Sequence, residues 1–354
     1  MRALIPVLVM LTVASCTTAG APTAQNGPSL LFYGLGGSIY VSDLSGAPAR
    51  KLTDGPGDTQ PAPSPDGRRV AYVHKTRSDA AGGELWVLDV ASGDKRRLVA
   101  PADLTPKFEG DDRPGVEDPR WSPAGDRIAF LKSSMGGGGF LLTAAADTGA
   151  VTAPPDVLFA DFGYAWSPDG KRIAWAGGRS DVSPVDINVL TVGGTSTPVA
   201  RDTNTFSVSY AADGHTVLFT NGDAHGSDFA AIPFAMRDGG VFAVDPPAQP
   251  KSLFSGGVSG TGSYADVSGL PSGAVAFTQW SPDWRMKTIV TVGADGARTT
   301  IAETPGDAPR PAWATDGVVA YLGTGDGHPL LVSRNGLVTT VDPGEGLVDA
   351  FAWG

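Results

Sequence analysis

Residues 164–175 read YAWSPDGKRIAW, and this stretch decides the fold. Its aromatic side chains Tyr164 and Trp166 stand two residues apart, which is the period of a pleated strand. The Pro-Asp-Gly run at 168–170 contains the residues that reverse a chain tightly. The apolar run at 173–175 then resumes an extended chain. The stretch therefore predicts a β-hairpin.

The same pattern recurs along the chain. The other copies are PAPSPDGRRVAY (61–72), PRWSPAGDRIAF (119–130), VSYAADGHTVLF (208–219), DVSGLPSGAVAF (266–277) and PAWATDGVVAY (311–321). Each copy is followed by a third apolar strand, such as ELWVLDV, and by a more polar fourth strand, such as DKRRLVA. Four antiparallel strands per unit of roughly 40–60 residues are typical of a β-propeller blade. A lone blade cannot bury both faces of its sheet, so the blades must form a ring.

The two ends of the repeat region predict how this ring closes. From Leu30 the chain has three strands with no leading hairpin partner, and residues 349–354, DAFAWG, match the first strand of a copy. We therefore predict an all-β fold, with residues 30–354 forming one propeller of seven four-stranded blades. The C-terminal strand would join the N-terminal three. The copy near 270–273 lacks the Pro-Asp-Gly turn, which leaves six or eight blades as alternatives.

The N-terminal segment predicts export and lipid anchoring. Residues 1–15, MRALIPVLVMLTVAS, combine a basic residue with an apolar run too short to span a bilayer. They precede Cys16, the single cysteine of the chain, in the arrangement of a bacterial lipobox. We expect residues 1–15 to be a signal peptide and 16–29 to be a flexible tether. A secretory signal cleaved near 19–21 is the alternative. Anchoring would place the protein on the outer face of the plasma membrane, or on the outer membrane of a two-membrane host.

The Pro-x-Trp-Ser-Pro-Asp-Gly-x-x-Ile-Ala-Phe pattern resembles the repeat of TolB-like propellers over essentially all of residues 30–354. The resemblance implies a propeller that acts in protein–protein interaction. It is specific for the fold and weak for function, because propellers of prolyl oligopeptidases carry the same repeat. TolB proteins also have an N-terminal α/β domain, for which we expect no room here. The tryptophans that recur at one repeat position, Trp121, Trp166, Trp313 and Trp353, indicate packing between blades.

Composition excludes some functions and leaves others open. The net charge of −11 argues against binding to a nucleic-acid backbone. No G-x-S-x-G, H-E-x-x-H or Walker motif occurs, so an enzyme is the less favoured class. The four histidines lack ligand spacing, and the acidic run at 109–118 lacks the Ca²⁺ ligand register, so we expect no cofactor, with Ca²⁺ the only weak alternative. We expect a monomer.

The longest loops lie on one predicted face of the ring and are our candidate recognition surface. Segments 101–118, 221–240 and 279–287 carry aromatic and arginine side chains suited to a protein interface. The candidate partner-binding residues are Phe108, Arg113, Phe229, Phe234, Arg237, Trp280, Trp284 and Arg285. The alternative is that these loops only cap the ring.

These observations predict a cell-envelope lipoprotein that binds another envelope protein through its loop-rich face. The alternative function is an enzyme or a small-ligand or glycan binder, with its site at the mouth of the central channel. Carboxylates near the starts of the first strands are the candidates for that site: Asp58, Asp118, Asp161, Asp266, Asp307 and Asp349.

Overall fold

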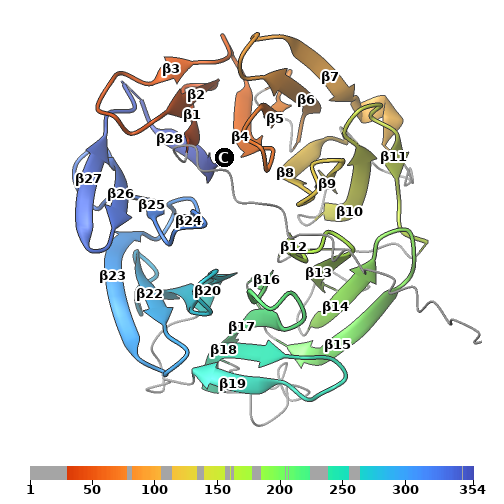
Figure 1. The fold of residues 1–354 in the computed structure, drawn as a ribbon, viewed down its shortest axis with the longest axis vertical. Coiled ribbons are helices and arrows are strands. Elements are labelled where there is room, and N and C mark those ends of the chain that lie inside the picture. Colours follow the sequence, from red (N-terminus) through yellow and green to blue (C-terminus); the bar gives the residue numbers. More distant parts are fainter. Residues whose placement is uncertain are drawn as a thin grey trace, which may run out of the picture.

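A computed structural model of the chain describes residues 30–77, 82–104, 114–133, 139–155, 160, 163–177, 185–203, 205, 207–223, 238–254, 264–344 and 346–354. These residues form seven four-stranded antiparallel sheets arranged as blades around a central channel (Figure 1). The predicted all-β propeller and its blade number are confirmed, and six or eight blades are excluded. The helical content of the described residues is one 3₁₀ turn, η1 (Pro101–Asp103).

Each blade runs from an inner strand beside the channel to an outer strand at the rim (Figure 1). Blade 1 contains β28 (Val348–Trp353), β1 (Leu31–Leu35), β2 (Ser38–Ser42) and β3 (Arg50–Lys51). Blade 2 contains β4 (Asp58–Pro63), β5 (Arg69–His74), β6 (Glu84–Asp89) and β7 (Lys95–Val99). Blade 3 contains β8 (Val116–Trp121), β9 (Arg127–Ser133), β10 (Gly139–Ala145) and β11 (Val151–Thr152). Blade 4 contains β12 (Tyr164–Trp166), β13 (Arg172–Gly177), β14 (Val185–Thr191) and β15 (Ser196–Thr203).

The remaining three blades follow the same order. Blade 5 contains β16 (Val208–Tyr210), β17 (Val217–Asp223), β18 (Asp238–Val244) and β19 (Lys251–Phe254). Blade 6 contains β20 (Tyr264–Gly269), β21 (Val275–Trp280), β22 (Met286–Val292) and β23 (Arg298–Pro305). Blade 7 contains β24 (Ala312–Trp313), β25 (Val319–Leu322), β26 (Leu330–Arg334) and β27 (Leu337–Val341). Blade 6 forms its first hairpin without Pro-Asp-Gly, because Gly273 supplies the left-handed conformation of the turn at φ 82°.

Blade 1 closes the ring as predicted. Strand β28 pairs antiparallel with β1, with Leu31 opposite Trp353 and Tyr33 opposite Phe351. The pairing continues one residue further, where the Gly354 amide donates to the Leu30 carbonyl at 2.9 Å. The edge of β1 that a propeller would otherwise leave open is thereby covered by main-chain hydrogen bonds.

The hydrophobic core is divided among the seven junctions between neighbouring blades. The described residues form seven buried clusters, and each combines side chains of two adjacent blades. The junction of blades 2 and 3, for example, packs Ala71 and Leu85 against Val116 and Phe130. Stability therefore comes mainly from contacts between nearest neighbours around the ring.

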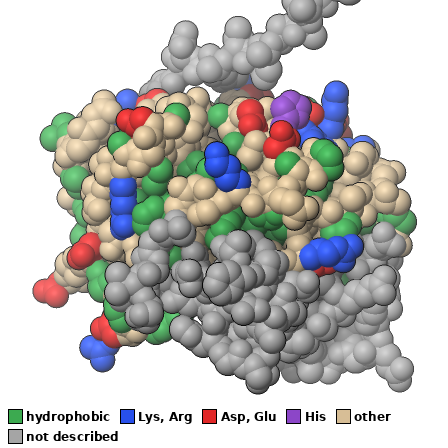
Figure 2. Space-filling view, turned by 90° about the horizontal axis from the view of Figure 1, so that it is seen from below, with side chains coloured by type: hydrophobic (Ala, Val, Ile, Leu, Met, Phe, Trp, Pro, Cys, Tyr) green, Lys and Arg blue, Asp and Glu red, His purple; other side chains and the backbone are tan. Residues whose placement is uncertain are grey.

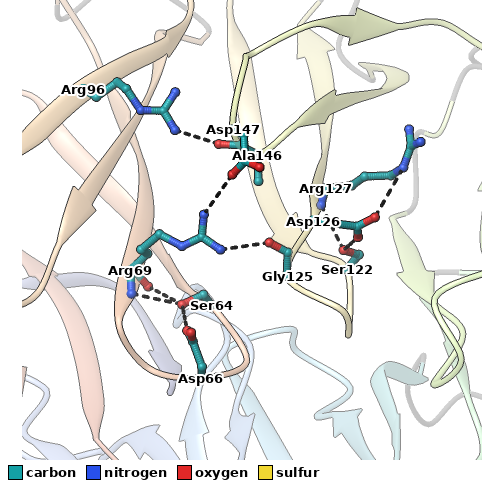
Figure 3. Close-up of polar contacts among 10 residues, drawn as sticks. All are labelled: Ser64, Asp66, Arg69, Arg96, Ser122, Gly125, Asp126, Arg127, Ala146 and Asp147. Atoms are coloured by element: carbon teal, nitrogen blue, oxygen red, sulfur yellow. Dashed lines mark hydrogen bonds and ion pairs between the residues drawn. The ribbon is translucent and has the colours of Figure 1, made fainter. Parts of the chain in front are cut away.

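The two faces of the disc are built differently. The hairpin face carries the turns that join the first and second strands of the blades. Figure 3 shows how Arg69 of blade 2 crosses to blade 3 on this face, where it donates to the Gly125 carbonyl at 2.9 Å. Arg172 makes the equivalent bond to Gly214 at 2.7 Å. These contacts lock neighbouring turns together.

The loop face carries the second-to-third connections and the segments that lead into the inner strands. An isolated bridge joins Gly83, in the second-to-third connection of blade 2, to Val116, the first residue of the inner strand of blade 3, so that connection and the start of that inner strand share this face. Seen from the side, the described surface carries acidic and basic side chains singly or in small mixed groups (Figure 2). Neither positive nor negative charge dominates the described surface that Figure 2 shows.

Candidate functional site

The central channel is lined by two levels of equivalent positions on the inner strands. The first level is the position just before the repeat tryptophan. Six blades place a small residue there, Ala62, Ala165, Ser209, Ser268, Ala312 and Ala352, and blade 3 places Arg120. A guanidinium thus stands where the repeat otherwise keeps the channel open.

The second level lies two residues earlier on each inner strand and is polar. It contains Gln60, Asp118, Gly163, Ser207, Asp266, Arg310 and Ala350. Gln60, Asp118 and Asp266 have positive φ angles of 52°, 47° and 54°. Each lies where the pairing to the second strand shifts register, which is a β-bulge. Bulges of this kind re-aim side chains and are frequent beside functional sites.

Arg120 is held in place by partners on two blades. Its Nε and Nη2 donate to the two carboxylate oxygens of Asp118 at 3.2 and 2.5 Å, and its Nη1 donates to the Tyr164 carbonyl. The guanidinium also lies 4.5 Å from the centre of the Tyr164 ring. Burial disfavours the cation, but the Asp118 carboxylate outweighs this effect and raises the pKa of Arg120. Gln60 supports the pair from blade 2, because its Oε1 accepts the Asp118 amide at 2.7 Å.

Arg310 contrasts with Arg120. It is exposed to the solvent of the channel, and it has no hydrogen-bond or ion-pair partner among the described residues. Repulsion from Arg120, followed by loss of hydration to the surrounding protein, lowers the pKa of Arg310. Two guanidinium groups therefore face one space while only one of them is neutralised.

Asp266 is fixed from within its own blade. Its Oδ2 accepts the Thr278 hydroxyl at 2.7 Å and lies 3.6 Å from the Lys287 ammonium. Lys287 is buried, and it also donates to the Ala308 carbonyl at 2.9 Å. This network holds a carboxylate and a cation in one geometry beside the channel.

A second polar group lies closer to the loop face, at the rim of the channel. Thr59 donates to the Asp349 carboxylate at 3.0 Å. Burial raises the pKa of Glu117, and Lys75 partly offsets that effect. Asp349 keeps an exposed surface, yet loss of hydration to the protein around it raises its pKa as well, and again Lys75 acts in the opposite direction. Burial thus disfavours the ionised form of both rim carboxylates, Glu117 and Asp349.

Two cavities occupy the channel between the Arg310 level and the hairpin turns. Their volumes are about 760 and 540 Å³. Both are lined by Arg120, Arg310, Trp313, Phe351, Ala352 and Trp353, and the larger one reaches Ser64 and Thr315. The larger cavity therefore extends to the hairpin face of the ring. The sequence instead predicts a ligand site at the opposite mouth of the channel.

The candidate channel carboxylates are brought together only in part. Asp118 and Asp266 line the cavities, and Asp349 lies on the rim. Asp58 is buried and bonded to His74, with 2.6 Å between Oδ1 and Nδ1, so its carboxylate is already engaged. Asp307 is exposed and lines neither cavity. Asp161 lies outside the described residues.

Three candidate partner-binding residues lie in the described part of the loop face. Trp280 and Trp284 flank the tight turn between β21 and β22, with ring centres 5.2 Å apart. Trp284 is 53% exposed, and Arg285 beside it is exposed too. The others lie outside the described residues: Phe108, Arg113, Phe229, Phe234 and Arg237. Cys16 does as well.

Sequence reasoning missed Arg120 and Arg310. Arg120 was identifiable in principle, because aligning the copies shows it replacing Ala or Ser. Arg310 needed the structure, since its position varies among blades and only the channel brings it near Arg120.

The residues that the structure describes lack two further features. No group of three or more His, Cys, Asp or Glu side chains within those ranges is placed to hold a metal ion. Among them there is also no helix of the length and apolar character that crossing a bilayer requires.

Comparison with known proteins supports the fold. No family model matches the chain. The uncharacterized peptidase YuxL of Bacillus subtilis is 29% identical over 118 residues, which are 32% of this chain and 16% of that protein. The chain thus aligns with less than a fifth of that relative's length.

Solved structures give wider coverage at low identity. TolB from Acinetobacter baumannii is 16% identical, with a TM-score of 0.54 over 95% of this chain and 68% of its own. An oligogalacturonate lyase in complex with manganese is 15% identical, with a TM-score of 0.57 over 89% and 85% of the two chains. The tricorn protease is 13% identical, with a TM-score of 0.63 over 90% of this chain and 34% of its own. These similarities show a TolB-like propeller fold, shared by proteins of different activities.

Proposed function

We propose that this protein is an exported, lipid-anchored propeller that binds another cell-envelope protein through its loop face. The observation that carries the proposal is the pair of Trp280 and Trp284. A tryptophan that is 53% exposed, braced by a second tryptophan and next to an arginine, has the composition of an interface hot spot.

The local structure makes this pair a rigid feature. The Ser281 hydroxyl donates to Asp283 at 2.6 Å, and the Trp284 amide donates to the Ser281 carbonyl at 3.0 Å. Trp284 has a φ of 59°, an uncommon conformation for a bulky residue. Because a rigid aromatic loses little conformational entropy on binding, this arrangement suits recognition better than capping.

The TolB-like fold supports interaction as the role, and the lipobox at Cys16 supports the cell envelope as the place. The lyase and peptidase similarities carry no catalytic residues over to this chain, because at this identity they concern the fold.

The test is site-specific photocrosslinking in cells. A photoreactive residue at position 285 should give one discrete protein adduct, and the change Trp284→Ala in the same chain should abolish it. The same probe at Leu337, which is 73% exposed on the outer strand of blade 7, is the matched control and should not give that adduct. An adduct that survives Trp284→Ala, or that forms equally from position 337, would overturn the proposal.

The anchor is tested separately by cell fractionation. The wild-type chain should sediment with membranes, and Cys16→Ser should release it into the soluble exported fraction. A Cys16→Ser protein that stays with the membrane would contradict lipid anchoring at this residue.

A further inference from the structure

We infer that Arg310 anchors a second binding site, inside the central channel, that holds the carboxylate of a small ligand. This site is separate from the loop face of the proposed function, so either can fail without the other. The inference rests on the different engagement of the two channel arginines and on the space beside them.

Arg120 already uses all three of its nitrogens, and three of its five N–H donors, for bonds within the protein. Its Nε, Nη1 and Nη2 groups already donate to Asp118 and to the Tyr164 carbonyl. Arg310 has all five of its N–H donors uncommitted among the described residues, and it is open to the channel. A planar guanidinium with free donors is the protein group best suited to bind a carboxylate through two parallel hydrogen bonds.

The local charge favours one negative group. Asp118 pairs with Arg120, and Asp266 pairs with the buried Lys287 just behind the cavity wall, whereas Arg310 has no ion-pair partner among the described residues. One positive charge therefore remains uncompensated. A carboxylate would neutralise it, whereas a doubly charged phosphate would leave an excess negative charge beside Asp118 and Asp266. The rim carboxylates Glu117 and Asp349 line neither cavity.

The cavities provide matching space and surface. Because the first channel level consists mostly of Ala and Ser, room is left for a ligand of sugar or dipeptide size. Trp313, Phe351 and Trp353 line both cavities and offer apolar surface next to Arg310. The expected ligand is therefore a compact molecule that carries a carboxylate and has an apolar or ring face. A sugar acid and the C-terminal carboxylate of a short peptide both satisfy it.

The binding test compares each acid with its neutral counterpart by titration calorimetry. The probes are D-glucuronate against D-glucose, and the tripeptide Ala-Ala-Ala against its C-terminal amide. We expect one or both acids to bind the wild-type chain at least about tenfold more tightly than the neutral probes. Binding of glucuronate alone identifies a sugar-acid site, binding of the tripeptide alone a peptide site, and binding of both a general carboxylate site.

Two variants assign the effect to Arg310. Arg310→Gln should weaken binding of the acid by about tenfold or more, whereas Arg97→Gln, which changes an exposed arginine on the outer strand of blade 2, should not. The inference is overturned if neither acid binds the wild-type chain, if Arg310→Gln binds as well as wild type, or if Arg97→Gln weakens binding equally.

Thermal unfolding provides a readout without ligand. Removing Arg310 relieves its repulsion with Arg120, so ligand-free Arg310→Gln should melt at or above the wild-type temperature. The bound acid should then raise the melting temperature of wild type and leave that of the variant unchanged. A lower melting temperature of the ligand-free variant would make Arg310 a structural residue and contradict the inference.

Discussion

The indole Nε1 of Trp121 donates a hydrogen bond of 2.8 Å to the carbonyl oxygen of Ala62, one blade before it in the chain. Trp166 makes the same bond to Arg120 at 3.0 Å, and Trp353 makes it to Ala312 at 2.9 Å. Each bond joins an inner strand to the inner strand of the preceding blade. The prediction that the recurring tryptophans serve packing between blades is confirmed for these three.

Replacing Trp121 with phenylalanine should therefore weaken the junction of blades 2 and 3. The ring would still fill most of the space, but the Ala62 carbonyl would lose its donor, so we expect a loss of about 1–3 kcal/mol in the free energy of unfolding. Urea unfolding measures it. The matched control Trp284→Phe changes an exposed tryptophan and should alter stability by less than about 0.5 kcal/mol. Equal effects of the two changes would contradict this account of the junction.

The hairpin turns should make stability depend on acid pH. The Ser167 hydroxyl donates to Asp169 at 2.6 Å, and this bond lowers the pKa of Asp169. A lowered pKa in the folded state means that the stabilisation is present above the ordinary carboxyl pKa and is lost as the pH falls through the lowered value. Asp169→Asn should cost under about 1 kcal/mol at pH 7, and the difference from wild type should shrink below about pH 4. Unfolding curves at pH 7 and pH 3 test this; a constant difference would refute it.

Glu117 should behave in the opposite sense. Its folded-state pKa is raised by burial, so ionisation at neutral pH opposes folding, and this penalty disappears when the pH falls below the unfolded-state value of about 4.3. Glu117→Gln should stabilise the protein at pH 7 by about 0.5 kcal/mol, the usual scale at a partly exposed position. The exposed Asp307 offers the control change Asp307→Asn, for which we expect a smaller effect. A destabilised Glu117→Gln at pH 7 would show that the carboxylate has a stabilising partner.

The fold could be predicted from the sequence because each further copy of the repeat supports the same interpretation of the pattern. One hairpin at 164–175 predicts little, but the same spacing along the chain requires a ring, and the unpaired DAFAWG strand requires its closure. Even the copy with Leu270-Pro271-Ser272 in place of the usual turn folds alike, because Gly273 supplies the one conformation that the turn needs. The fold tolerates variation in the other turn residues.

The site was less accessible, because function here depends on differences between copies and on which side chains converge. Asp58 and Asp118 stand near the starts of neighbouring inner strands, yet one is bonded to His74 within its blade and the other faces the channel beside Arg120. The two are not at equivalent repeat positions: Asp118 is equivalent to Gln60, which has the same bulge, and Asp58 lies two residues earlier on its strand. Which of these positions faces the channel depends on the bulge, and the sequence pattern does not reveal the bulge.

The bond between Leu30 and Gly354 also determines from which face of the disc the propeller chain begins. Gly354 lies beside Pro63 and lines the larger cavity together with Ser64, so the first described residue of the propeller leaves from the hairpin face, close to the axis. Trp284, in a second-to-third connection, lies on the opposite face of the disc, whereas the Arg310 cavity extends to the same hairpin face from which the propeller begins. The two candidate sites are therefore accessible from opposite sides of the ring.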